Sequence, residues 1–191
     1  MRLKKPRLTK RQERLWNTLI FMIKILLFSI PMYVLLAFSQ ILLPLQAAVS
    51  SNTVFLLRLM GFDAGVQSLF ISISGANPFI FVVSEDCTGW KSMLFLIALV
   101  SAVPAVEMRK RLAGFLIGLP VIYAGNLVRI ILVVIIEQSF GLQAAMLFHD
   151  VLWQAGLIAL VLAVWTLWFM WARKAGRAKP KRAARTRKRR R

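Results

Sequence analysis

The residue types that could perform covalent chemistry are scarce in this chain and fall at the edges of apolar runs. Its 191 residues include one cysteine, Cys87, and one histidine, His149. Cys87 opens the run CTGWKSMLFLIALVSAV and His149 opens HDVLWQAGLIALVLAVWTLWFMW, while Arg129 lies inside a third run, LAGFLIGLPVIYAGNLVRIILVVII. A thiol and an imidazole are the pair that nucleophilic cysteine catalysis uses. One cysteine and one histidine without clustered acids do not form a closed metal shell, so we expect neither a metal nor a cofactor.

Each of these residues also has a reading without chemistry. Cys87 fits a small buried hydrophobe, and His149 fits a histidine at the membrane interface. A guanidinium in the membrane interior costs at least about 2.5–3.5 kcal/mol on insertion scales, so Arg129 is expected to have a role. That role is either a clamp to an acid such as Glu85 or Asp86, simple snorkelling, or the holding of an oxyanion or carboxylate by a rigid fork of donors.

The elements that must position these residues are membrane helices. The chain is 59% hydrophobic, which is above the range of soluble domains, and the excess is concentrated in long blocks. An apolar run of 18 or more residues is long enough to cross the hydrocarbon core. This predicts an all-α membrane protein with about four transmembrane helices, near residues 18–43, 88–106, 112–136 and 150–171. Residues 18–172 would form the catalytic domain, between a basic tail at 1–17 and a disordered basic tail at 173–191.

The net charge of +19 is concentrated in these tails, since seven of the 26 Lys and Arg fall in residues 1–14 and twelve in 173–191. Basic segments stay in the cytoplasm, as does the EMRKR turn between the second and third spans. Both termini are therefore expected inside, with Cys87, Arg129 and His149 near the extracytoplasmic face. The tails are expected to contact anionic lipid headgroups. RNA or ribosome binding by the C-terminal tail is the weaker alternative, and no nucleic acid is expected as a partner.

The segment 46–86 carries Arg58 against three acids and is expected outside the membrane. Its first part has helical apolar spacing with Gly61 as a stop, typical of a helix in the interface. VQSLFISISG and NPFIFVV then indicate a β-hairpin with its turn at 75–78, which could pair with an extended peptide along its edge.

Around the cysteine, Ser84, Glu85 and Asp86 favour a helix start that would place the sulfur in the first helical turn, where a thiolate is stabilised. The two acids oppose that effect unless they face Lys91 or backbone donors. Asn126 lies one turn before Arg129 and would extend the same polar patch. Asp150 is expected to act as a helix cap.

Three motifs together resemble the exosortase/archaeosortase family of membrane-embedded cysteine transpeptidases. They are DCTGWKS at Cys87, GNLVRI at Arg129 and FHDVLW at His149, in that order, within a region from about Val66 to Trp168. The resemblance implies Cys87 as the nucleophile, His149 as the acid/base and Arg129 as the stabiliser of the oxyanion or thiolate. It also implies secreted substrates that end in a short motif, a membrane helix and a basic tail, cleaved near the motif and transferred to an acceptor, often a lipid.

The competing hypothesis is a multi-pass membrane protein of the cell membrane without enzymatic activity. Such a transport or assembly subunit would use Arg129 to bind an anion or a partner. The two hypotheses differ over Cys87, which only the enzyme requires.

Overall fold

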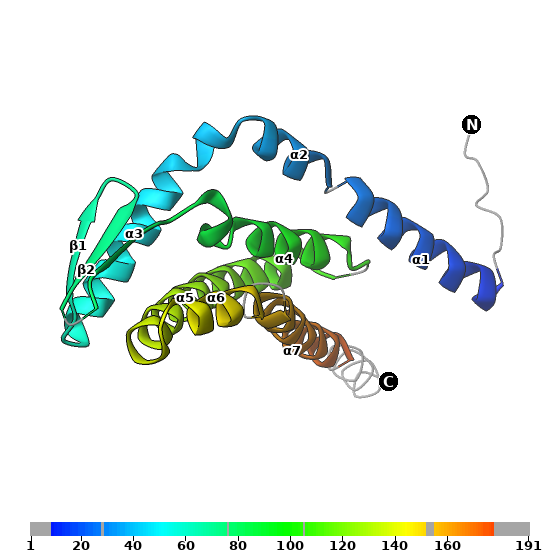
Figure 1. Ribbon diagram of the computed structural model, residues 1–191. Coiled ribbons are helices and arrows are strands. Elements are labelled where there is room, and N and C mark those ends of the chain that lie inside the picture. The colour runs from blue at the N-terminus through cyan, green and yellow to red at the C-terminus, as the bar shows by residue number, and fades with distance from the viewer. Residues whose placement is uncertain (1–8, 28, 76, 105, 152–154, 178–191) are drawn as a thin grey trace.

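The protein is largely helical, with a small sheet at one end. The computed structural model describes residues 9–27, 29–75, 77–104, 106–151 and 155–177. Figure 1 shows the chain running through α1 and α2 into α3 and the sheet, and then into the packed helices α4 to α7. The helices are α1 (Lys10–Leu27), α2 (Ser29–Ala37), the 3-10 helix η1 (Ser39–Leu42), α3 (Leu43–Leu59), the 3-10 helix η2 (Glu85–Thr88), α4 (Trp90–Ala102), α5 (Met108–Phe140), α6 (Leu142–Val151) and α7 (Leu157–Arg177).

Within the described residues, four helical segments are long and apolar enough to cross a membrane: Arg11–Ala37, Gln40–Leu59, Met108–Phe140 and Leu157–Lys174. This confirms the predicted number of about four, although the four candidates are not the same four segments. The expected span at 88–106 contains the 13-residue helix α4, which is about 20 Å long and shorter than the roughly 20 residues of a full membrane helix. The fourth segment is Gln40–Leu59, part of which we had assigned to the outer region.

Local geometry explains why α4 is short. The apolar run continues past Ala102, but Val103 takes an extended conformation with ψ 120°. Val103 precedes Pro104, and a residue before proline is disfavoured in the helical region. Hydropathy alone does not register this break, because valine and proline leave the run apolar.

The expected tails and spans also differ at their ends. Helix α1 begins at Lys10 and α7 continues to Arg177, so parts of the predicted 1–17 and 173–191 tails are helical. Residues 1–8 and 178–191 lie outside the described part of the chain. Helix α5 reaches Phe140 rather than 136, and most of the stretch between the expected spans at 112–136 and 150–171 belongs to α5 and α6. Gly141, at φ 81°, separates the two helices.

The sheet is antiparallel, with strands β1 (Asp63–Gln67), β2 (Phe70–Ser74) and β3 (Phe79–Val82) in that order. The predicted pairing across residues 75–78 is present as β2–β3. The single strand expected over VQSLFISISG is wrong, because the chain reverses there in a two-residue turn between Gln67 and Phe70. Ser68 has φ 57°, the positive value that tight hairpin turns require. Strand β1 was not predicted.

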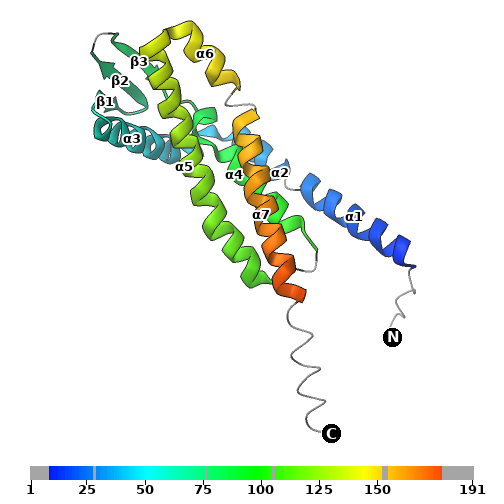
Figure 2. The same cartoon turned by 90° about the horizontal axis from the view of Figure 1, so that it is seen from below.

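Two apolar clusters hold the protein together, and α5 contributes to both. The first joins α3, the sheet and the C-terminal half of α5, through residues such as Leu57, Ile71 and Ile130. The second joins α4, α7 and the N-terminal half of α5, through residues such as Leu96, Ile122 and Trp168. Figure 2 shows α5 running the length of the molecule between the sheet and the end at which α7 finishes.

Glycines let α4 and α7 approach α5 closely. An added Cβ at Gly114 would lie 2.6 Å from Nε1 of Trp168, and one at Gly118 would lie 2.5 Å from Cδ2 of Leu96. Trp168 is fixed in place, since its Nε1 donates a hydrogen bond to the carbonyl oxygen of Lys110 at 2.8 Å. Small residues at such contacts are typical of helix packing in membranes.

We expect Gly114→Ala to destabilise the protein by about 1–3 kcal/mol, because the indole of Trp168 must move to admit a methyl group. The expected loss of stability is opposite in sign to the effect of helix propensity, which favours alanine over glycine. The measurement is thermal unfolding in detergent, with Ala113→Gly as a control that changes helix propensity on the same turn. Combining Gly114→Ala with Trp168→Leu should cost less than the sum of the single changes. Unchanged stability of Gly114→Ala would contradict this packing.

Candidate functional site

Cys87 lies in a short turn that precedes α4. It belongs to η2, and Gly89 with φ 75° separates this turn from the helix. The prediction that its sulfur sits in the first turn of a spanning helix was therefore wrong by one turn. Ser84 closes η2, since its carbonyl accepts a hydrogen bond from the Cys87 amide at 3.0 Å and its Oγ lies 3.3 Å from the Cys87 sulfur. The sulfur is half-buried and free of a disulfide.

Asn126 attaches this turn to α5. Its Nδ2 donates a hydrogen bond to the carbonyl oxygen of Cys87 at 2.7 Å, and its side chain is fully buried. A Cβ at Gly89 would lie 3.1 Å from Cγ of Asn126, so the turn and α5 are in tight contact. A fully buried amide with a short hydrogen bond holds the backbone of the cysteine at one place on α5.

Arg129 lies one helical turn after Asn126 on the same face of α5 and is 4% exposed. Its guanidinium group lies close enough to the side chain of Cys87 to interact with it electrostatically, and it is also attracted by Asp86. Its Nε and Nη1 are buried and have no hydrogen-bond partner among the described residues. Because unpaired buried donors are costly, they indicate a place for an acceptor that a ligand brings.

A direct ion-pair clamp between Arg129 and a neighbouring acid is not seen among the described residues, where Asp86 is the acid that attracts the guanidinium. In the described part of the chain, no ion pair joins Arg129 to Glu85 or Asp86. Asp86 instead pairs with Lys91, with 2.6 Å between Oδ1 and Nζ. The sequence left open whether Glu85 and Asp86 face Lys91. Asp86 does form a pair with Lys91, which therefore balances part of the negative charge that would otherwise repel a thiolate at Cys87.

His149 lies in the last turn of α6, not at the start of the last spanning helix. The expectation that it opens a span near 150 was wrong, because α7 begins at Leu157. Figure 2 shows α6 as a separate helix that turns back from the end of α5. His149 itself is half-buried. The side chain of Asp150, expected as a cap, lies outside the described ones.

Cys87, Arg129 and His149 line one cavity of about 220 Å³. The remaining lining is mostly apolar and comes from three elements: Phe81, Val82 and Val83 at β3; Ile130, Val133, Val134 and Glu137 of α5; and Leu142, Ala145 and Met146 of α6. The structure thus brings together the three residues that the sequence singled out. Their catalytic roles stay predictions.

Glu137 is the polar residue of this cavity that the sequence reasoning missed. It lies eight residues after Arg129 on α5, which is about two helical turns, and Gln138 donates to its Oε2 at 3.2 Å. The sequence could have indicated Glu137 by its spacing, because an acid two helical turns after Arg129 falls near the same helix face.

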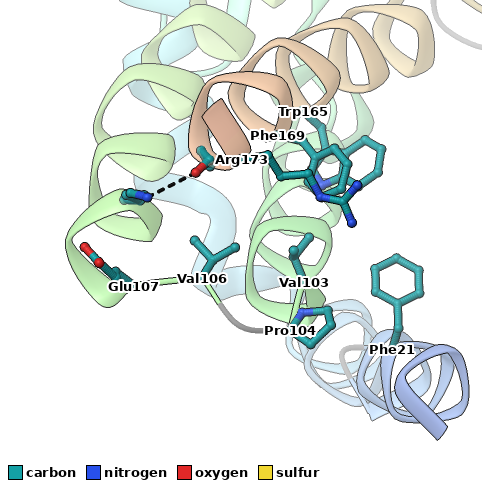
Figure 3. A pocket seen from close by; sticks show the side chains of 10 residues that line it. Phe21, Val103, Pro104, Val106, Glu107, Trp165, Phe169 and Arg173 are labelled. Carbon is teal, nitrogen blue, oxygen red and sulfur yellow. Dashed lines mark hydrogen bonds between the residues drawn. The ribbon is translucent and has the colours of Figure 1, made fainter. Parts of the chain in front are cut away.

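A larger cavity of about 640 Å³ lies toward the other end of α5 (Figure 3). Its lining includes the aromatic side chains of Phe21, Trp165 and Phe169 and the charged side chains of Glu107, Lys110 and Arg173. Lys110 donates to the carbonyl oxygen of Ala172 at 3.0 Å, and Arg173 lies over the ring of Phe169. Its lining residues include no thiol or imidazole, so the smaller cavity is the candidate site for cysteine chemistry despite its size.

Comparison with known proteins agrees with the motifs. The chain matches the family described as transmembrane exosortase (Exosortase_EpsH) over residues 9–169. It is also similar to archaeosortase A of Haloferax volcanii, with 33% identity over 113 residues. That alignment covers 56% of this chain and 36% of archaeosortase A, so the chain spans only about a third of this relative. No solved structure matches. The chain belongs to the transmembrane exosortase family, which confirms the resemblance, and is a multi-pass membrane protein.

The contact between Arg129 and Cys87 predicts how reactive the thiol is. We expect Arg129→Gln to slow alkylation of Cys87 by iodoacetamide several-fold at pH 7.5, because the neighbouring cation stabilises the thiolate that reacts. Arg129→Lys keeps a positive charge and should retain more of the rate. Mass spectrometry of the modified peptide follows the reaction in the purified protein. An equal rate in all three proteins would show that the guanidinium does not act on the sulfur.

Proposed function

We propose that this protein is a membrane cysteine peptidase and transpeptidase that removes the C-terminal sorting signal of secreted proteins and transfers them to a membrane anchor. The observation that supports this most directly is the shared cavity of Cys87, Arg129 and His149, in which the arginine interacts electrostatically with the thiol. Membership of the exosortase family and the similarity to an archaeosortase point to the same class of reaction.

In the proposed reaction the Cys87 thiolate attacks a peptide carbonyl of the substrate, forming a carbon–sulfur bond and an oxyanion. The buried donors of Arg129 stabilise that oxyanion, and the two nitrogens without partners among the described residues have the capacity to do so. His149 protonates the departing amine as the carbon–nitrogen bond breaks, which leaves a thioester on Cys87. In the second half, His149 removes a proton from the acceptor, either water or an amine or hydroxyl group on a lipid, and the acceptor displaces the thiol.

The proposed site faces the extracytoplasmic side. Support comes from the distribution of charge, since Lys110 near the start of α5 contacts Ala172 near the end of α7. Arg109, Arg111, Arg173 and Lys174 therefore gather at one end of the described part of the chain. Lys110 is nineteen residues before Arg129, about 28 Å along the helix. Positive residues remain in the cytoplasm, so the end that carries the cavity and the sheet is assigned to the outside.

The second candidate is an anion-binding transport or assembly subunit. The unpaired Nε and Nη1 of Arg129 favour it, because an anion could accept both hydrogen bonds without any role for the thiol. This candidate gives no role to the electrostatic interaction between Arg129 and Cys87, which is why we prefer the enzyme.

We expect Cys87→Ala to abolish processing, since no other cysteine can form the thioester. The measurement is the mass shift of a reporter fused to the C-terminal membrane helix and basic cluster of a secreted protein from the same genome. Cys87→Ala should insert and unfold like the wild type. Processing at the wild-type rate by this variant, combined with loss of function in Arg129→Gln, would instead support the anion-binding subunit.

A further inference from the structure

The cavity at Cys87 opens onto the edge of the sheet rather than onto one of its faces. Three consecutive residues line it on this side, namely Phe81, Val82 and Val83. Successive side chains of a strand point to opposite faces of the sheet. A cavity that is lined by all three residues therefore borders the hydrogen-bonding edge of the strand. Strand β3 is an outer strand of the sheet, because the strand order is β1-β2-β3.

The register shows which backbone groups of β3 point toward this edge. The Val83 amide donates to the carbonyl of Leu69 at 2.9 Å, just beyond the pairing of Phe70 with Val82 and Ile71 with Phe81. Hydrogen-bonded and non-hydrogen-bonded pairs alternate along an antiparallel ladder. Phe79 and Phe81 thus bond to β2, while the N–H and C=O groups of Ile80 and Val82 point away from it.

The opposite edge of the sheet supports this assignment. By the same alternation, Ala64 and Val66 of β1 point outward, and the Ala64 carbonyl does accept a hydrogen bond from Arg58 at 2.7 Å. No hydrogen bond within the described residues reaches the outward groups of Ile80 and Val82. Their side chains are 70% and 49% exposed.

We propose that the free edge of β3 binds the substrate as a fourth strand, an inference that rests on the proposed function. The occupant is the extended segment of the substrate that carries the scissile bond, held by main-chain hydrogen bonds to Ile80 and Val82. A strand added there lies about 4.8 Å from β3, on the side of the cavity that also holds Cys87 and Arg129. Continuity between the edge and the reactive thiol is the reason for choosing this occupant over a second copy of the chain.

The membrane gives a physical reason for such a contact. A peptide must be unwound before a thiol can reach its carbonyl, and an unwound segment near apolar surroundings has backbone groups that need partners. The Ile80 and Val82 groups supply donors and acceptors at the repeat that an extended chain requires. Recognition through the backbone then leaves the apolar cavity to select the side chain beside the scissile bond.

The test compares Ile80→Pro with Val66→Pro. Each substitution removes one outward N–H from an edge strand, and neither residue lines the Cys87 cavity. Proline is tolerated at such edge positions because no ladder bond is lost. With the reporter described above, we expect Ile80→Pro to lower kcat/KM at least about fivefold, as the loss of a backbone hydrogen bond together with the bulk of the ring implies. Val66→Pro should stay within twofold of wild type. Equal rates for the two variants would overturn the inference, provided both unfold at the wild-type temperature.

A binding measurement separates this inference from the proposed chemistry. In a Cys87→Ala background, p-benzoylphenylalanine placed at residue 80 should crosslink the intact reporter on irradiation, whereas the same group at residue 66 should not. Two results together would support the docking edge and reject the thioester mechanism. The first is crosslinking from residue 80 but not from residue 66, and the second is continued processing of the reporter by Cys87→Ala. Equal crosslinking from both positions, or none from residue 80, would reject the docking edge whatever the activity of Cys87→Ala.

Discussion

Burial of a permanent cation on α5 is the constraint on which the rest of the site depends. Arg129 is 4% exposed, and a guanidinium inside a membrane protein is costly unless its donors are used. One of its interactions is with Cys87, and Asn126 on the same face holds the backbone of that cysteine. Two neighbouring positions on one helix therefore determine where the thiol lies. The remaining donors, Nε and Nη1, have no partner among the described residues.

Helix α5 can carry this polar face because its two halves pack differently. Its N-terminal half is held by close contacts at Gly114 and Gly118 with α4 and α7. Its C-terminal half packs against α3 and the sheet. The contacts at Gly114 and Gly118 bring α4 and α7 close to the N-terminal half, whereas the C-terminal half borders the cavity that holds Cys87 and Arg129. Rigid support at one end and an open site at the other suit a catalyst that must hold its groups in place.

The site itself is built from short or irregular elements rather than from long spans. Cys87 lies in a 3-10 turn, His149 in the short helix α6 and the proposed docking edge in the four-residue strand β3. Irregular backbone in a membrane protein is tolerated where it is buried in protein or lines a cavity, and these elements all border the same one. The residues of the three family motifs thus line the same cavity. The larger cavity at the other end of α5 has a different character, with aromatic and charged walls.

The sequence by itself determined the membrane class, the family and the three reactive residues, because each depends on composition or on spacing within one segment. Helical periodicity alone placed Asn126 and Arg129 on one face. The tertiary structure decided how the segments meet: that α4 is short, that β1 completes the sheet, that α6 turns back at Gly141 and that Glu137 reaches the cavity. Hydropathy averages over a window, so it cannot register a single proline or a left-handed glycine that ends a helix. The shared cavity of Cys87, Arg129 and His149 arises from the packing of η2 and α6 against α5, and no pattern along the chain encodes that arrangement.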